Sequence, residues 1–163
     1  MVSRKVILTG NFGVGKTSLF NRFVYDRFSD KYLTTIGVKV NKKVIEVEGE
    51  ELSILLWDIA GEVSQDKVPV SYFLGAAGIV YVFDMSRPLT FEHIEKDIAH
   101  LKEMLPNSII KVVGNKKDLL DEATILSVVS SLSMGCDITT SAKTGENVEE
   151  MFLDLGRELL NKE

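Results

Sequence analysis

Cysteine and long apolar runs are scarce in this chain, and each scarcity excludes a class of protein. The 163 residues include one cysteine, Cys136, so no internal disulfide can form and a reducing compartment is expected. The chain does not start with a secretory leader, and no apolar run reaches the roughly 20 residues of a membrane-spanning helix. Residues 159–163 contain neither a cysteine that could be lipidated nor a basic cluster. We therefore expect a cytoplasmic protein with no membrane anchor visible in this chain.

An excess of basic residues is also missing. The net charge is −5, and acidic and basic residues are interspersed. This disfavours nucleic acid as a partner, because proteins that bind nucleic acids gather lysine and arginine into a basic patch. The chain also lacks a linker, an internal repeat and a low-complexity segment. Its length suits one domain with a sizeable core, so we expect residues 1–163 to form a single domain.

Residues 10–17 match the phosphate-binding pattern G-x-x-x-x-G-K-[ST] in full. The apolar run 6–8 before them is typical of a buried strand, and apolar residues at helical spacing follow over 18–23. A glycine-rich loop in this setting turns its N–H groups toward phosphate oxygens, and the helix N-terminus favours their negative charge. A chance glycine-rich turn is the alternative, which the flanking strand and helix disfavour. The residues expected to bind a nucleoside triphosphate are Gly13, Val14, Gly15, Lys16, Thr17 and Ser18, and the Thr17 hydroxyl is also expected to bind Mg²⁺.

The remaining apolar patterns alternate between strands and helices. Strands are expected at 5–9, 38–47, 52–56, 79–83, 109–113 and 136–139. Helices are expected from the phosphate loop to about residue 25, over 90–105 with Thr90 as N-cap, over 123–132, and from 147 with Asn147 and Glu150 as a capping box. This alternation predicts an α/β fold with a mostly parallel sheet and one antiparallel hairpin strand.

A second motif, D-x-x-G, begins at Asp58, directly after the third expected strand. A carboxylate at that point can hold Mg²⁺, usually through a water molecule, and the Gly61 N–H can approach the γ-phosphate of a bound nucleotide. Tetrapeptides of this pattern are common in proteins. The motif at Asp58 is informative because it follows a strand and lies downstream of a phosphate loop.

A third motif, Asn115-Lys116-Lys117-Asp118, follows the fifth expected strand and concerns the base. A carboxylate at Asp118 can accept two parallel hydrogen bonds from N1–H and the exocyclic amine of guanine, whereas adenine offers neither donor in that arrangement. The stem of Lys116 can lie over the base, and Asn115 can tie neighbouring loops together. An exposed polar turn is the alternative. After the last strand, the backbone N–H groups of Ser141, Ala142 and Lys143 can bind the guanine O6.

Taken together, these motifs resemble the Ras superfamily of small GTPases over essentially the whole chain. The phosphate loop, Thr35-Ile36-Gly37, the D-x-x-G and N-K-x-D motifs and the Ser-Ala-Lys triplet occur in family order. The tryptophan before Asp58 and the run that begins Tyr72-Phe73 look most like the Rab branch, although residues 63–67 lack the Glu-Arg-aromatic run common there. The resemblance implies a six-stranded, mostly parallel sheet with five helices.

The resemblance also implies a monomeric switch that binds GTP or GDP with Mg²⁺ and meets effectors and regulators through two switch regions. Switch I would be residues 26–39, where Phe28 edges the guanine and Thr35 closes on Mg²⁺ and the γ-phosphate. For Phe28, ordinary packing is the alternative. Switch II would cover residues 60–73, and Trp57 would belong to an apolar effector surface.

Two positions depart from the family pattern at the catalytic centre, which the resemblance assigns to Lys16, Thr35, Gly61 and the residue after that glycine. That residue is usually a glutamine that orients the attacking water, but here it is Glu62. An ionised carboxylate cannot donate a hydrogen bond and brings negative charge toward the γ-phosphate. With a raised pKa it could instead accept a proton from the water.

The other departure is Phe12, where the family usually has a small residue. A phenyl ring there should crowd a partner's arginine finger or cover the phosphates, or it packs against switch II without consequence. We therefore expect a GTPase with slow intrinsic hydrolysis. The alternative is a GTP-binding module that does not hydrolyse GTP and acts as a protein-interaction scaffold. A small-metabolite kinase is disfavoured because the chain has no spare segment for a substrate site and lid.

Overall fold

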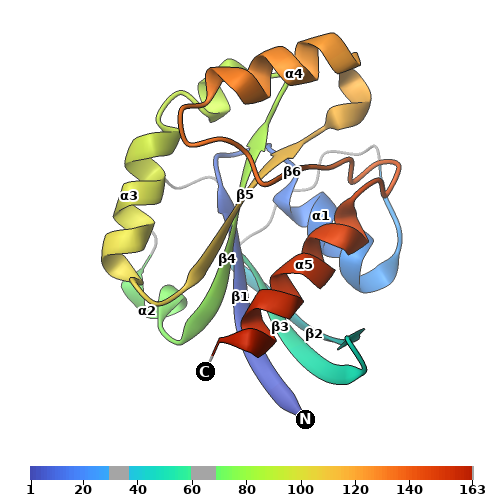
Figure 1. Ribbon diagram of the computed structural model, residues 1–163, viewed down its shortest axis with the longest axis vertical. Coiled ribbons are helices and arrows are strands. Elements are labelled where there is room, and N and C mark those ends of the chain that lie inside the picture. The colour runs from blue at the N-terminus through green and yellow to red at the C-terminus, as the bar shows by residue number, and fades with distance from the viewer. Residues whose placement is uncertain (30–36, 60–68, 163) are drawn as a thin grey trace.

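The computed structural model describes residues 1–29, 37–59 and 69–162, and within them a single six-stranded sheet forms the centre of the molecule (Figure 1). The strand order is β2-β3-β1-β4-β5-β6. All neighbouring strands are parallel except the β2–β3 pair. The strands are β1 (Val2–Gly10), β2 (Val38–Val47), β3 (Glu50–Ile59), β4 (Ala76–Asp84), β5 (Ile109–Asn115) and β6 (Ile138–Thr139).

Five α-helices of the described residues cover the two faces of this sheet. In Figure 1, α2 and α3 lie to the left of the sheet, while α1 and α5 lie to its right. The helices are α1 (Lys16–Tyr25), α2 (Val70–Phe73), α3 (Ile94–Met104), α4 (Glu122–Ser131) and α5 (Val148–Asn161). The α/β fold expected from the sequence is confirmed.

Alternation along the strands divides the apolar core in two. Val6 and Leu8 of β1 pack with α1 and α5 on one face, and Ile7 between them packs with α3 on the other. This is the period of two expected of a strand that is buried on both faces. On the first face, the rings of Phe23 and Phe152 stack 3.8 Å apart and join α1 to α5.

The β2–β3 hairpin closes through Glu48 and Gly49, both of which have positive φ angles of 52° and 83°. A two-residue loop with left-handed backbone matches the twist of antiparallel strands. The expected hairpin is therefore confirmed; β2 has the expected bounds, and β3 runs longer than the expected 52–56.

The side-chain caps expected for two helices are wrong, although α5 begins directly after Asn147 as expected. The Thr90 hydroxyl accepts a hydrogen bond from the Asp84 N–H (3.0 Å) and donates to the Arg87 carbonyl (2.8 Å), so it closes a turn after β4, and α3 starts at Ile94. The Asn147 side chain does not cap α5; its amide donates to the Thr139 carbonyl at 2.8 Å. In both cases a tertiary contact takes the polar group that local spacing assigned to a cap.

The last strand is also shorter than expected, since β6 covers only Ile138–Thr139. Among the helices of the described residues, none has both the length and the apolar character of a membrane span.

Candidate functional site

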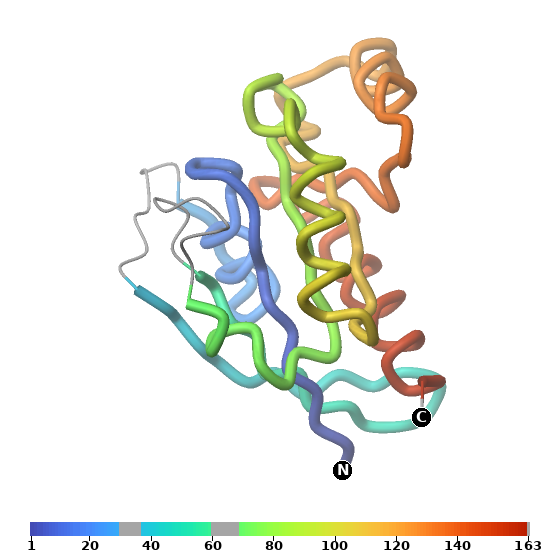
Figure 2. The backbone as a smooth tube through the Cα atoms, turned by 90° about the vertical axis from the view of Figure 1, so that its left-hand side faces the viewer, coloured from blue at the N-terminus to red at the C-terminus, as the bar shows by residue number. Residues whose placement is uncertain are grey.

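The loops that follow β1, β4 and β5 gather at the end of the molecule opposite the two termini (Figure 2). The carboxyl ends of parallel strands meet at one edge, where open α/β sheets bind their ligands. At this edge, polar side chains that are almost fully buried lie at or next to the ends of three strands, namely Asp58 of β3, Asp84 of β4 and Asn115 of β5. Several buried polar side chains at one edge of the sheet indicate a ligand-binding site there.

The phosphate loop turns sharply around two glycines at which any side chain would be strained. Gly10 has a φ of 145°, and a Cβ there would lie 2.1 Å from the Val82 carbonyl oxygen. Gly15 has a φ of 101°, and a Cβ there would lie 2.3 Å from the Asn115 amide nitrogen. Gly15 is the N-cap of α1 and makes no side-chain cap bond. A helix N-terminus without a side-chain cap favours the binding of an anion.

Lys16 is buried at the start of α1, and its ammonium donates to the carbonyls of Gly10 (3.1 Å) and Asn11 (3.0 Å). Burial lowers the pKa of Lys16 to about 8, against the opposing effect of the nearby Asp58 charge. A phosphate oxygen next to this ammonium would favour its charged form. The residue has the position and the chemistry of a phosphate ligand.

The Thr17 hydroxyl donates to Asp58 Oδ2 at 2.7 Å, and Asp58 is fully buried. A hydroxyl and a carboxylate at a phosphate loop are the hard oxygen ligands that Mg²⁺ takes beside nucleotide phosphates. Within the described residues, no cluster of three or more His, Cys, Asp or Glu side chains could hold a metal by itself. The pair fits a Mg²⁺ ion that takes its other ligands from phosphate and water.

Asn115 connects the phosphate loop to the loop that follows β6. Its amide donates to the Val14 carbonyl (3.0 Å), and its Oδ1 accepts from the Thr140 hydroxyl (3.1 Å) and the Ala142 N–H (3.3 Å). Lys116 has a left-handed backbone, with φ 65°, and donates to the Gly13 carbonyl at 2.9 Å. Direct bonds therefore join the two expected parts of the site.

The expected guanine-binding carboxylate, Asp118, is exposed and held by a buried neighbour. Ser141, which is fully buried, donates its hydroxyl to Asp118 Oδ1 at 2.8 Å. The Ser141 hydroxyl in turn accepts from the Thr144 N–H at 3.1 Å. The sequence assigned Ser141 only a backbone role, and the structure adds a side-chain role that orients Asp118.

Arg22 of α1 binds the backbone of the two residues that follow Ser141. Its guanidinium donates to the carbonyls of Ala142 (2.9 Å) and Lys143 (2.6 Å) and pairs with Asp26 at 3.1 Å. Phe28 is partly buried against the core under α1.

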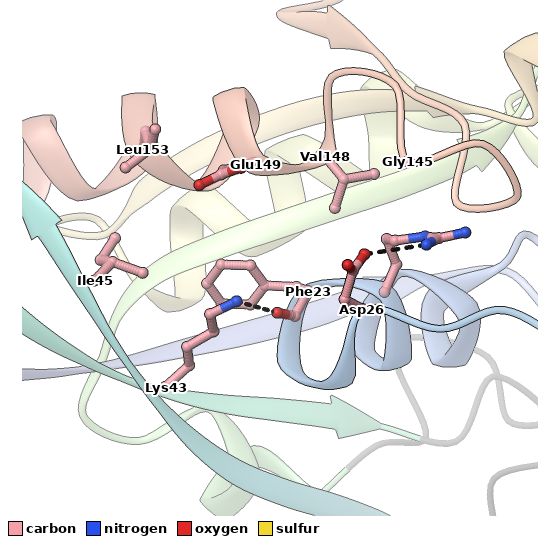
Figure 3. Close-up of a pocket in the computed structure, with 9 residues that line it drawn as sticks. Phe23, Asp26, Lys43, Ile45, Gly145, Val148, Glu149 and Leu153 are labelled. Atoms are coloured by element: carbon pink, nitrogen blue, oxygen red, sulfur yellow. Dashed lines mark hydrogen bonds and ion pairs between the residues drawn. The ribbon is translucent and has the colours of Figure 1, made fainter.

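Arg22 and Asp26 also line a hollow of about 240 Å³ between α1, β2 and α5. Figure 3 shows Phe23, Lys43 and Ile45 on one side of this hollow and Val148, Glu149 and Leu153 on the other. The Lys43 ammonium donates to the Phe23 carbonyl and lies over its ring. None of the expected nucleotide-binding residues lines this hollow.

Three expected site residues, Thr35, Gly61 and Glu62, lie outside the described residues. Conversely, Arg22, Asp84, Arg87 and Thr140 contact the site and were missed. Asp84 had a usable signal, because it is a carboxylate at the end of an apolar run, as Asp58 is. The arginines had none, since each is a single residue outside any motif.

Comparisons with known proteins agree on one family. The model of the Ras family matches residues 5–161. The chain is 35% identical to the Ras-related protein Rab-4 of Dictyostelium discoideum, covering 97% of this chain and 80% of that protein. It is 34% identical to Rab-1A of the same organism and 32% identical to human Rab-8B, covering 81% and 79% of those proteins.

Proposed function

The chain belongs to the Ras family, and on this premise we propose how its own residues serve a switch that binds and hydrolyses GTP. The observation that carries the proposal is the direct bonding between the phosphate loop and the loop of Asn115 and Lys116. This bonding makes one continuous site for a base and its phosphates. We assign the phosphates to Lys16, with the backbone N–H groups of Gly13, Val14, Gly15, Thr17 and Ser18.

GTP and GDP are bound together with Mg²⁺, which neutralises phosphate charge when it is present. We assign the metal to Thr17 and Asp58, supported by their 2.7 Å bond and the burial of the carboxylate. Thr35 and the Gly61 N–H are proposed to complete the site around the γ-phosphate, by resemblance to the family.

Guanine is assigned to Asp118, the stem of Lys116 and the backbone at Ala142, with Asn115 as the link between loops. Further members are Ser141, Lys143 and, at the edge of the base, Phe28. The support for Asp118 is its hydrogen bond from a fully buried serine, since a carboxylate that is held in place discriminates between bases better than a mobile one.

We assign slow intrinsic hydrolysis to this switch because of Phe12 and Glu62. The Phe12 side chain is 44% exposed on the phosphate loop, where it stands in the way of an incoming arginine finger. Glu62 cannot orient water as a glutamine amide does while it is ionised.

The test identifies the nucleotide released when freshly purified protein is denatured, and then measures single-turnover hydrolysis. Phe12→Gly and Glu62→Gln should each speed hydrolysis by about tenfold or more, because either change restores a feature of efficient family members. Released GTP would support slow turnover, and released GDP would show that turnover survives both departures. If neither substitution speeds hydrolysis, the assignment is wrong.

Members of this family meet effectors and regulators, and we propose that this chain does so through the region around Trp57 as a cytoplasmic monomer. The Lys5 ammonium lies 3.8 Å from the Trp57 ring centroid and donates to the Leu74 carbonyl. Val40, paired with Trp57 across β2 and β3, is 48% exposed, and Leu74 is 62% exposed. An apolar patch beside the switch regions suits a protein partner.

A further inference from the structure

Three consecutive carbonyls of the phosphate loop accept hydrogen bonds from side chains that lie outside the loop. Arg87 follows β4, Asn115 is the last residue of β5, and Lys116 comes directly after it. The bonds run from Arg87 Nη1 to the Phe12 oxygen (3.3 Å), from Lys116 Nζ to the Gly13 oxygen (2.9 Å) and from Asn115 Nδ2 to the Val14 oxygen (3.0 Å).

These bonds set the direction of three N–H groups. In a trans peptide the C=O and the following N–H point to opposite sides, and the described residues contain no cis peptide. Carbonyls that are held outward at residues 12–14 therefore turn the N–H groups of residues 13–15 toward the other side. Those N–H groups are the donors that cradle the phosphates in a loop of this type.

Arg87 is the member of this set that no motif contains. Its own backbone is fixed at both ends, because its N–H donates to the Asp84 carbonyl (3.0 Å) and its carbonyl accepts from the Thr90 hydroxyl (2.8 Å). The guanidinium lies directly against the loop, since a Cβ on Gly13 would be 2.9 Å from Nη1.

Asp84 links two of the three donors. Its side chain is fully buried, and Oδ2 lies 3.0 Å from the Lys116 ammonium and 4.0 Å from the Arg87 guanidinium. Its Oδ1 accepts from the Ser86 N–H at 2.9 Å, which fixes the carboxylate. A buried carboxylate between two cations holds both in the direction of the loop.

We propose that Arg87 is a positioning residue for phosphate binding. With Asp84, it completes a three-point support that keeps the N–H groups of residues 13–15 directed at the β-phosphate of a guanosine di- or triphosphate. Arg87 acts through the loop backbone. Its loss therefore weakens the binding of nucleotides that carry a β-phosphate and leaves the binding of those without one nearly unchanged.

The test compares Arg87→Met, which keeps the length of the side chain and removes the donors, with Arg87→Lys and with Arg4→Met. Within the described residues, the hydrogen bond of the Arg4 side chain goes to its neighbour's carbonyl, at Ser3 on β1, and the substitution makes the same change in net charge far from the site. Dissociation rates of fluorescent GDP and GTP analogues and the affinity for GMP are measured, with thermal unfolding of each nucleotide-free variant as a check on folding.

We expect Arg87→Met to raise the dissociation rates of GDP and GTP by about tenfold, as for the loss of one charge-assisted hydrogen bond. GMP affinity should change by less than about twofold, because GMP lacks the β-phosphate. Arg87→Lys should restore much of the loss, and Arg4→Met should match the wild type. The proposal fails if Arg87→Met leaves both dissociation rates unchanged or weakens GMP as much as GDP.

Discussion

At the scale of single residues, Arg22 and Arg87 support opposite ends of the same nucleotide site. Arg22 holds the carbonyls of Ala142 and Lys143 from outside, while Arg87 holds the phosphate loop. Because the carbonyl of Ala142 points outward, the Lys143 N–H of the same peptide points to the opposite side. Arg22 thereby directs the Lys143 N–H, one of the backbone donors proposed for the base.

The substitution Arg22→Ala should therefore weaken the binding of GMP, GDP and GTP by the same factor. The side chain is 18% exposed, and the loss of its bonds to two carbonyls should raise GDP dissociation about tenfold. GMP affinity should fall by the same factor, unlike the result expected for Arg87→Met. Arg157→Ala is the control, because among the residues that the structure describes Arg157 pairs with Glu48 and Asp154 on the surface, away from the site. A GMP affinity equal to wild type would contradict this role.

The sequence predicted the residues that belong to motifs and missed those that support them. Thr17, Asp58 and Asn115 could be placed because their spacing from strand ends is part of a known chemistry. Ser141 was assigned a backbone role, since nothing in a triplet shows that its hydroxyl reaches Asp118. Arg22 contacts residues 120 and 121 positions further along the chain, and local patterns carry no information about such pairs.

At the scale of elements, a hydrogen bond from a buried tyrosine hydroxyl joins α3 to the sheet. Tyr81 of β4 is fully buried and donates to Asp97 Oδ2 of α3 at 2.6 Å. Burial, together with Asp97, raises the pKa of Tyr81 well above its ordinary value. The folded protein therefore keeps this phenol neutral at a pH where the unfolded chain loses the proton.

Tyr81→Phe should lower the free energy of unfolding by about 1–2 kcal/mol at pH 8, the usual cost of losing a hydrogen bond to a charged group. Above about pH 10 the unfolded state binds fewer protons at Tyr81 than the folded state, so wild-type stability falls as the pH rises. The variant should lack the part of this decrease in stability that comes from ionisation of Tyr81 in the unfolded state. Urea unfolding at pH 8 and pH 10.5 checks both effects, with Tyr72→Phe as control. An unchanged pH dependence would contradict the assignment.

The strand at 79–83 was easier to predict than the start of α3, and the reason is physical. A run such as 79–83 is apolar because both faces of β4 are covered, so burial alone identifies it. The start of α3 was wrong because the Thr90 side chain finds its partners outside the helix, whereas α5 begins directly after Asn147 as expected although the Asn147 side chain bonds elsewhere.

At the scale of the whole molecule, the nucleotide site joins parts that are distant in the chain. The phosphate loop follows β1, the carboxylate proposed for the metal lies one residue before the end of β3, and the residues proposed for guanine follow β5 and β6. The bonds of Asn115 and Lys116 to Val14 and Gly13 cross the sheet edge without any ligand. A ligand that contacts all of these loops therefore stabilises the folded chain as a unit.

GDP with Mg²⁺ should consequently raise the melting temperature, and the rise should depend on the base. At 100 times its Kd, a ligand adds about 2.7 kcal/mol, which corresponds to about 5–10 °C for a domain of this size. Nucleotide-free protein is heated with GDP and Mg²⁺, with GDP and a chelator, or with ADP and Mg²⁺ at the same concentration. The chelator should reduce the rise, because Thr17 and Asp58 then lose the ion they share with the phosphates. ADP should give almost none, because adenine lacks the N1–H and 2-amino donors that Asp118 would bind in guanine. An equal rise with ADP would contradict the guanine assignment, whereas no rise with GDP would contradict the whole site.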